Sequence, residues 1–292
     1  MITRKKFRLR LPSRTLVLGE RTLLMGVVNV TPDSFSGDGL HLDTKAAATR
    51  AIEMERDGAD IIDIGGESTR PGAEWLAADE ELGRVIPLVN MLRGRLKIPI
   101  SIDTNKSEVA EAAAEAGAEI INDVTALQRD PRIAEVARRR KLPLILMHMR
   151  GEPRTMQTQP FARDAMRDVT QNLKKAAALA TRKGVPKSQL VLDPGIGFGK
   201  SFAQNYELIA RLPELARLGF PLLVGPSRKG FIGRTLGGVP ENERAFGTAA
   251  AVTACILQGA HIVRVHDVRE MAQVSRVADM LVSPKLRHRS RP

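Results

Sequence analysis

The sequence contains little of what several classes of protein need. It has one cysteine, Cys255, in 292 residues, which excludes an internal disulfide framework and indicates a reducing compartment. Aromatic residues make up only 3%, so no platform for stacking nucleic-acid bases is expected. No apolar run approaches the roughly 18 residues that a membrane-spanning helix requires. We therefore expect a cytoplasmic protein that binds neither nucleic acid nor membrane.

The positive charge is concentrated at the two ends of the chain. The net charge is +12, and ten of the basic residues are Arg4, Lys5, Lys6, Arg8, Arg10, Arg14, Lys285, Arg287, Arg289 and Arg291. Without them, 35 basic and 33 acidic residues remain, so the body of the chain is nearly neutral. We expect a basic extension with a short β-hairpin at 1–20, a single domain at 21–283 and a basic tail at 284–292. Solvated ends are favoured over an organellar transit peptide.

Apolar, β-branched segments alternate with helix-forming segments eight times. The expected strands are 23–30, 59–64, 98–102, 119–121, 142–147, 189–192, 220–224 and 261–265. The expected helices after them are 44–57, 78–92, 107–116, 132–141, 162–183, 202–212, 241–257 and a last helix that ends near 282. Eight such units predict an α/β fold of the (βα)₈ TIM-barrel type, with a doubly wound open sheet as the alternative.

A weak internal repeat runs through three of these units, at 58–64, 117–123 and 259–265. In each copy a glycine ends a helix and apolar residues enter the sheet. An ordinary connection between a helix and the next strand accounts for the glycine and the apolar residues. It does not account for the polar residue at one shared position, which is Asp63, Asn122 or Arg264.

Polar side chains gather where the expected strands end. The set is Asn29, Asp63, Thr69, Arg70, Asp103, Asn122, His148, Asp193, Ser227, Lys229, Arg264 and His266. Any one of them could be a helix cap or part of a structural ion pair. In a barrel all of them would share one face, which is where catalytic residues of this fold collect. So many on one rim predicts a binding site.

Four of these residues suit a flat heterocycle. Asp103, Asn122 and Asp193 offer oxygen acceptors and Lys229 an ammonium group. Such a set matches a ring that carries N–H and amino donors together with a carbonyl acceptor.

A second group suits a phosphate or pyrophosphate. Arg264 and His266 follow the last strand and Asn29 the first, and these strands are neighbours in a closed barrel. No cluster has zinc spacing, so a hard metal such as Mg²⁺ that bridges phosphates is the more plausible ion.

The segment 193–201 imitates a phosphate-binding loop. It ends in Gly-Lys-Ser between a strand and a helix, but the leading glycine of that motif is replaced by Pro194, which has no N–H to donate. We interpret the segment as a glycine-rich loop that brings backbone close to a flat ligand.

The motifs together resemble those of dihydropteroate synthases. Residues 29–36, Asn-Val-Thr-Pro-Asp-Ser-Phe-Ser, look like the first signature of that family, and 65–72, Gly-Gly-Glu-Ser-Thr-Arg-Pro-Gly, like the second. Further matches follow in the family's order at 103–104, 121–123, 147–149, 193–200, 227–229 and 264–268. The resemblance implies a TIM-barrel transferase of folate biosynthesis. Such an enzyme joins p-aminobenzoate to 6-hydroxymethyl-7,8-dihydropterin pyrophosphate, requires Mg²⁺, forms a homodimer and is a sulfonamide target.

The same resemblance implies roles for individual residues. The pterin would be bound by Asp103, Asn122, Met147, Asp193, Phe198 and Lys229. Pyrophosphate would be bound by Asn29, Arg264 and His266, with Asn29 also at the metal, and p-aminobenzoate by Thr69, Arg70, Pro71 and Ser227. The residues expected to be catalytic are Asp103, Lys229, Arg264 and His266. A dissociative reaction is implied, in which pyrophosphate leaves before the aniline nitrogen attacks.

One departure from the family pattern and two alternatives remain. Family members commonly read Asp-Ser-Phe-Ser-Asp-Gly-Gly in the first loop, whereas this chain has Gly37-Asp38-Gly39 after the second serine. The shifted acid affects loop closure more than substrate identity. The alternatives are a pterin-binding paralogue without turnover and a methyltetrahydrofolate:corrinoid methyltransferase. The latter would lack the first signature and the pair Arg264 and His266.

Overall fold

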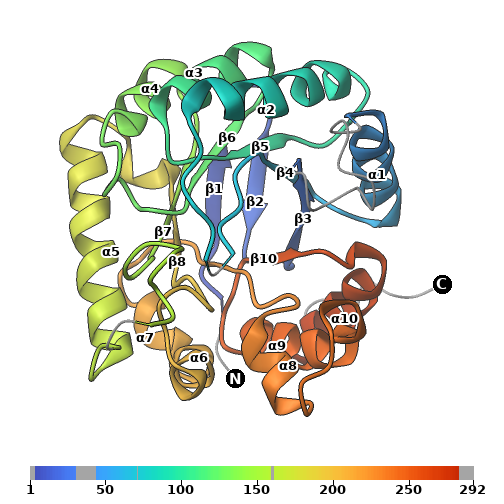
Figure 1. Cartoon of the computed structure of the whole chain (residues 1–292), viewed down its shortest axis with the longest axis vertical. Helices are drawn as coiled ribbons and strands as arrows, with labels where there is room; N and C mark the ends of the chain where they lie inside the picture. Colours follow the sequence, from blue (N-terminus) through green and yellow to red (C-terminus); the bar gives the residue numbers. More distant parts are fainter. Residues whose placement is uncertain (1–3, 31–43, 71, 159–160, 283–292) are drawn as a thin grey trace.

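The computed structural model describes residues 4–30, 44–70, 72–158 and 161–282, and its central feature is a ring of parallel strands (Figure 1). The strands are β3 (Leu23–Asn29), β4 (Ile61–Gly65), β5 (Ile100–Asp103), β6 (Ile120–Asp123), β7 (Leu144–Met147), β8 (Leu190–Asp193), β9 (Leu223–Val224) and β10 (Ile262–Val265). Their order is β8-β7-β6-β5-β4-β3-β10-β9. A parallel bridge between Leu192 and Leu222 joins the two ends of this order. The predicted (βα)₈ barrel is confirmed.

Helices surround the strands on the outside (Figure 1). They are α1 (Thr44–Asp57), α2 (Ala78–Leu92), α3 (Ser107–Ala116), α4 (Ile133–Arg140), α5 (Ala165–Arg182), α6 (Phe202–Ala210), α7 (Leu212–Ala216), α8 (Gly230–Thr235), α9 (Ala245–Leu257) and α10 (Val268–Val282). Short 3-10 turns, η2 (Lys187–Gln189) and η3 (Glu241–Glu243), precede β8 and α9. No described helix is long and apolar enough to cross a membrane.

The predicted N-terminal hairpin is present and closes one end of the barrel. Strands β1 (Phe7–Arg10) and β2 (Thr15–Leu18) pair antiparallel and lie inside the ring of strands in Figure 1. Their buried Leu9 and Leu18 belong to the same apolar cluster as Met25 and Ile61 of the barrel strands. The hairpin therefore supplies the apolar floor on which the interior of the barrel rests.

The expectation of a solvated N-terminal extension is wrong for Arg4. Its side chain is buried, donates to Thr22 Oγ1 at 2.6 Å and to Ala260 O at 3.1 Å, and forms an ion pair with Asp279 of α10. A buried arginine needs such partners because an unpaired charge in the interior is costly. The C-terminal tail at 284–292 lies outside the described residues.

The interior of the barrel is layered because side chains alternate along each strand. Toward the hairpin the inward residues are apolar and include Met25, Ile61, Ile120, Ile145, Val191 and Ile262. Two residues further along the same strands stand Val27, Asp63, Asn122, Met147, Asp193 and Arg264. The strand period thus places a mainly polar layer directly above an apolar one, at the carboxyl ends of the strands.

Candidate active site

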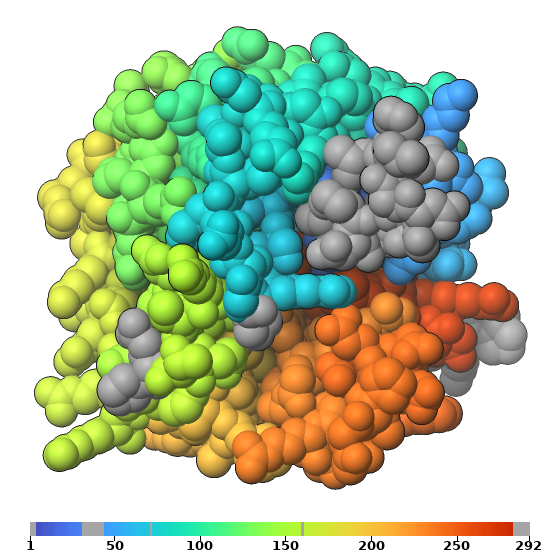
Figure 2. Space-filling view, in the orientation of Figure 1, coloured from blue at the N-terminus to red at the C-terminus, as the bar shows by residue number. Residues whose placement is uncertain are grey.

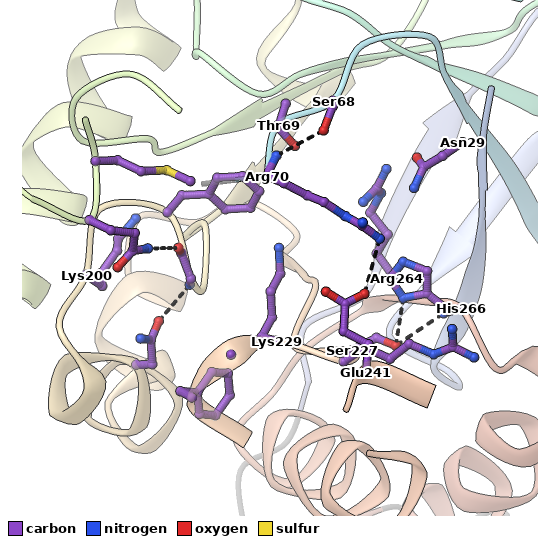
Figure 3. A pocket seen from close by; sticks show the side chains of 18 of the residues that line it. Asn29, Ser68, Thr69, Arg70, Lys200, Ser227, Lys229, Glu241, Arg264 and His266 are labelled. Carbon is purple, nitrogen blue, oxygen red and sulfur yellow. Dashed lines mark hydrogen bonds and ion pairs between the residues drawn. The ribbon is translucent and has the colours of Figure 1, made fainter. Parts of the chain in front are cut away.

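A cavity of about 360 Å³ opens at the carboxyl ends of the strands (Figure 3). The predicted residues that line it are Asn29, Thr69, Arg70, Asp103, Phe198, Ser227, Lys229, Arg264 and His266. A smaller cavity of about 20 Å³ shares Asp103, Phe198, Lys229 and Arg264 with it and adds Asn122, Met147 and Asp193. The structure therefore brings together every described residue to which a binding role was assigned, whereas Asp63 and His148 of the predicted rim line neither cavity. Pro71 lies outside the described residues, as do residues 31–43 with most of the first motif.

The polar layer is organised around Arg264. Its Nε lies 2.6 Å from Asp63 Oδ2 and its Nη2 lies 2.7 Å from Asp103 Oδ2. Asn122 Nδ2 donates to the same Asp63 oxygen at 3.1 Å. Sequence reasoning placed Asp63 on this rim without a role, and the structure shows that it holds both Arg264 and Asn122.

Burial dominates the electrostatics of this layer. It raises the pKa of Asp103, while the nearby Arg264 guanidinium lowers it. Burial also raises the pKa of Asp193 to about 6, although Gly195 N donates to its Oδ1 at 2.7 Å. Burial therefore favours the neutral forms of Asp103 and Asp193, and the Arg264 guanidinium opposes that effect by favouring their charged forms.

Lys229 stands in the middle of the cavity (Figure 3). Its Nζ lies 4.0 Å from the centroid of the Phe198 ring, a cation–π contact. Burial and the nearby Arg264 lower the pKa of Lys229 to about 8. Its ammonium is therefore charged at neutral pH but loses its proton more easily than a surface lysine.

His266 and Ser227 contact each other at the wall of the cavity. Ser227 Oγ accepts from His266 N at 3.2 Å and lies 3.1 Å from His266 Nδ1. Burial and Arg264 lower the pKa of His266 to about 3, so the ring is neutral at physiological pH. A neutral imidazole offers one acceptor nitrogen and one N–H donor to a ligand.

The backbone at Arg228 fixes the direction of Ser227 and Lys229. Arg228 has a φ of 58°, an unusual value for a residue with a side chain. Thr248 Oγ1 accepts from Arg228 N at 3.1 Å, and Arg244 Nη1 donates to Arg228 O at 2.8 Å. An ion pair between Arg228 and Asp267 adds a third tie. The roles of Arg228 and Arg244 depend on contacts between distant segments. Arg228 lies in the matched segment 227–229 but had no assigned role, and no motif included Arg244.

The glycine-rich loop is tied down by a buried lysine. Lys200 Nζ donates to Gly195 O at 2.8 Å and to His148 O at 2.9 Å, and lies 2.9 Å from His148 Nδ1. A Cβ at Gly195 would lie 1.9 Å from His148 O, so only glycine permits this approach. The three N–H groups of Lys200 are thus directed at protein acceptors, which agrees with the rejection of a phosphate-binding loop.

His148 is the centre of that arrangement and does not reach the cavity. Its Nε2 lies 3.5 Å from Asp168 Oδ2. Burial and Lys200 lower the pKa of His148 to about 4, so the ring is neutral. Because Lys200 donates toward Nδ1, the proton of the neutral ring belongs on Nε2, which faces Asp168.

Comparisons with known proteins agree with this arrangement. A family model described as "pterin binding enzyme" matches residues 25–266. The chain is 51% identical over 263 residues to the dihydropteroate synthase of Synechocystis, covering 90% of this chain and 91% of that protein. The chain belongs to the dihydropteroate synthase family. The predicted synthase and transferase class are thereby confirmed.

Two solved structures of this family share the fold. The Yersinia pestis dihydropteroate synthase in complex with a sulfonamide drug is 43% identical, with a TM-score of 0.89 over 94% of this chain and 99% of that one. The Xanthomonas albilineans dihydropteroate synthase with 4-aminobenzoic acid is 40% identical, with a TM-score of 0.89 over 99% of this chain and 100% of that one. The named relatives favour a synthase over the methyltransferase alternative.

Two segments of this family member frame the mouth of the cavity. Arg70, in the segment after β4, extends across the cavity to Glu241 of η3, with 3.2 Å between Nη2 and Oε2 (Figure 3). In the space-filling view the cyan segment after β4 lies next to the orange residues around α8 and α9 (Figure 2). The pair is more than half exposed and therefore weak. It shows that the Arg70 guanidinium can reach the far wall of the cavity.

The described residues of the cavity offer few protein ligands, so a metal ion there would be held mainly by the bound substrate. No group of three or more His, Cys, Asp or Glu in the described part of the chain could hold a metal ion. Asn29 ends β3 beside Gly65, where a Cβ would lie 3.5 Å from Asn29 Oδ1 and 3.5 Å from Asp103 Cβ. A single amide oxygen next to a carboxylate would suit a Mg²⁺ ion, which prefers oxygen ligands.

Proposed function

We propose that this chain joins 6-hydroxymethyl-7,8-dihydropterin pyrophosphate to p-aminobenzoate and releases 7,8-dihydropteroate and pyrophosphate. The observation that carries the proposal is the polar layer of Asp63, Asp103, Asn122, Asp193 and Arg264 inside the barrel, adjoining Lys229. A layer of buried carboxylates next to cations suits a flat, hydrogen-bonding ring better than an aliphatic substrate.

The pterin would enter this layer edge first. Asp103, Asn122 and Asp193 would accept from its ring N–H and amino groups, and Lys229 would donate to its carbonyl oxygen. Met147 and Phe198 would line the faces of the ring. Because Lys229 Nζ lies 4.0 Å from the Phe198 ring, the lysine must swing aside for a pterin to take that face.

The p-aminobenzoate would bind nearer the mouth, between Thr69, Arg70, Pro71 and Ser227. A cation there suits its carboxylate, and Arg70 is held by an exposed pair with Glu241 that a bound carboxylate could replace. The solved Xanthomonas relative contains 4-aminobenzoic acid, and the Yersinia relative contains a sulfonamide. We expect sulfonamides to compete with p-aminobenzoate in this chain as well.

The pyrophosphate would lie near Asn29, Arg264 and His266. Bound Mg²⁺ would supply positive charge to the leaving group. The bond between the pterin methylene and the pyrophosphate oxygen breaks first, and Arg264 faces the charge that develops on that oxygen. The aniline nitrogen then bonds to the methylene and gives up a proton. The carboxylate of Asp103 stabilises the cationic pterin between the two steps, so no protein nucleophile is required.

Binding of the pterin substrate alone tests the assignment of the inner layer. Titration of the purified protein with the dihydropterin pyrophosphate and Mg²⁺ should give saturable binding that weakens at least about tenfold in Asp103→Asn and Lys229→Ala. Exposed Glu108→Gln serves as the control and should bind as the wild type does. Equal affinity in all four proteins would refute the assignment. Binding without turnover would favour the paralogue.

Homodimerisation is proposed through α9 and α10. Phe246 is 91% exposed, Val277 65% and Leu281 47%, and the two helices lie side by side (Figure 1). Exposed apolar side chains on adjacent helices are often covered by a second copy of the chain. Light scattering should give the mass of a dimer for the wild type and of a monomer for Phe246→Glu; a monomeric wild type would refute the proposal.

The division into a basic extension, a barrel at 21–283 and a basic tail stays a proposal, as does cytoplasmic localisation. The latter rests on the lone thiol of Cys255, whose pKa is raised by burial in α9. A buried thiol of this kind is unreactive, so the protein does not need an oxidising compartment for disulfide formation.

A further inference from the structure

A buried ion cluster lies behind the segment that follows β4. Lys106 Nζ is 2.9 Å from Glu67 Oε1 and 2.5 Å from Glu81 Oε2. The side chains of Lys106, Glu67 and Glu81 are 9%, 4% and 0% exposed. Two carboxylates and one ammonium are thus buried together, and removing one partner would leave a buried charge unpaired, which is costly.

The Glu67 carboxylate accepts three hydrogen bonds from the protein itself. Its Oε1 accepts from Leu76 N at 2.5 Å as well as from Lys106. Its Oε2 accepts from Asn105 Nδ2 at 2.5 Å. A carboxylate with three donors has little capacity left for a substrate, although Glu67 belongs to the motif that lines the cavity.

These bonds attach both ends of one loop to the same group. Glu67 starts the loop, and Leu76, whose N–H it accepts, ends it just before α2. The start is fixed further because Arg84 Nη1 donates to Gly66 O at 2.9 Å. A Cβ at Gly66 would lie 2.7 Å from Val85 Cγ1, so this backbone packs directly on α2. The loop between these points carries Thr69 and Arg70.

We propose that Glu67, clamped by Lys106 and Asn105, is a positioning residue that sets the place of Thr69 and Arg70 and thereby the affinity for p-aminobenzoate. The inference rests on the proposed function of this same site. A shift of about 1 Å in a substrate-positioning group can cost up to about a hundredfold in rate. The polar layer is held by the pairs of Arg264 with Asp63 and Asp103, and Glu67 acts on Asp103 only as a nearby negative charge.

Glu81 keeps the clamp in place. Burial raises the pKa of Glu81, and Lys106 opposes that shift. Glu81 Oε1 has no hydrogen-bond partner in the part of the chain that the structure describes. The ammonium of Lys106 is thus the group that binds Glu81 of α2 to Glu67 of the loop.

The fluorescence of Trp75 can report the conformation of this loop. Trp75 is its only tryptophan, and it lies next to Leu76, whose N–H donates to Glu67. Its ring packs 4.3 Å from the Arg129 guanidinium. Loosening the clamp should therefore change the emission of Trp75 and its quenching by acrylamide, whether or not the enzyme turns over.

The test compares Glu67→Gln with Glu108→Gln. Glu108 is an exposed carboxylate on α3 that pairs with Arg132 at 2.9 Å. This distance equals that between Lys106 Nζ and Glu67 Oε1. For Glu67→Gln we expect the KM for p-aminobenzoate to rise about tenfold, the KM for the pterin substrate to change less than about twofold, and Trp75 quenching to increase. Glu108→Gln should behave as the wild type does.

Asn105→Ala removes one donor to Glu67 and is the second variant, in case Glu67→Gln does not fold. Its KM for p-aminobenzoate should rise by about threefold to tenfold, again without a matching change for the pterin. Equal rises for both substrates, or unchanged values for both, would overturn the inference. If the wild type makes no product, the proposed function fails, and unchanged Trp75 quenching in the folded variants would then overturn the clamp separately.

Discussion

Arg264 and Asp63 occupy the same position in two copies of the internal repeat, and their side chains meet inside the barrel, with 2.6 Å between Nε and Oδ2. The third copy contributes Asn122, which donates to the same oxygen at 3.1 Å. The shared position is polar because equivalent inward positions on three strands converge at one level of the barrel. Asp63 therefore holds both Arg264 and Asn122 within the polar layer.

The first prediction concerns Asp63. Asp63→Asn keeps the shape but removes the charge beside Arg264, which leaves that guanidinium with Asp103 as its carboxylate partner. Loss of one partner of a buried pair costs several kcal/mol, so we expect the free energy of unfolding to fall by about 3 kcal/mol and pterin binding to weaken. Urea denaturation and pterin titration measure the two effects. Unchanged stability would show that Asp63 and Arg264 are not paired in solution.

The second prediction concerns pH. Burial lowers the pKa of Lys229 to about 8, and a lysine is charged below its pKa. The value of kcat/KM for the pterin substrate, which reports the free enzyme, should therefore fall by about tenfold between about pH 7 and pH 9. Lys229→Arg stays charged over this range, so its lower activity should be flat. A decline of the same shape in Lys229→Arg would assign the titration to another group.

The third prediction concerns Lys200. Lys200→Met leaves the carbonyl oxygens of Gly195 and His148 buried without their ammonium donor. The loop that carries Phe198 should loosen, and the KM for the pterin substrate should rise by at least about tenfold while that for p-aminobenzoate stays within about twofold. Lys183→Met, which removes a partly exposed pair with Glu135, is the matched control. A rise in the KM for p-aminobenzoate alone would contradict this role.

The fourth prediction concerns the N-terminal extension. Arg4→Met leaves Asp279 buried without its cation, so the free energy of unfolding should fall by about 3 kcal/mol while kcat at 25 °C changes little. Lys6→Met removes an exposed pair with Glu20 and should cost less than about 1 kcal/mol. Thermal and urea unfolding compare the two. Equal, small losses would contradict a stabilising role for the pair of Arg4 and Asp279.

The sequence predicted the ends of helices well where residues within the helix determine them. Helices α1, α2 and α3 begin and end at the predicted residues. Strand ends shifted by one to three residues, because strand ends are set by neighbouring strands: β9 keeps only Leu223–Val224 of the predicted 220–224. The predicted helix at 202–212 ends at Ala210, and Leu212–Ala216 forms a second one, with Pro213 in its first turn.

Two elements near the site escaped prediction. Helix α8 (Gly230–Thr235) was not among the expected elements, and its two glycines disfavour a helix. The predicted helix at 241–257 begins only at Ala245, because η3 occupies its first residues. Both differences lie between Lys229 and α9, where a Cβ at Gly233 of α8 would lie 2.5 Å from Arg244 Cζ, so the glycine permits a close approach that local preference does not predict.

The sequence predicted which residues lie at the site, but not which of them pair with one another. Alternation along parallel strands places Asp103, Asn122 and Arg264 on one rim whatever their partners are. Which groups pair depends on the register between strands and on segments far apart in sequence. Lys200 with His148 and Arg4 with Asp279 are such pairs, and no spacing within the sequence indicates them.

One measurement tests the central claim most directly. The purified chain is mixed with dihydropterin pyrophosphate, p-aminobenzoate and Mg²⁺, and dihydropteroate and pyrophosphate are measured in the same sample. We predict equal amounts of the two products, and neither above background in Asp103→Asn. Pyrophosphate without dihydropteroate, or no product from a protein that binds the pterin, would contradict the proposed synthase reaction.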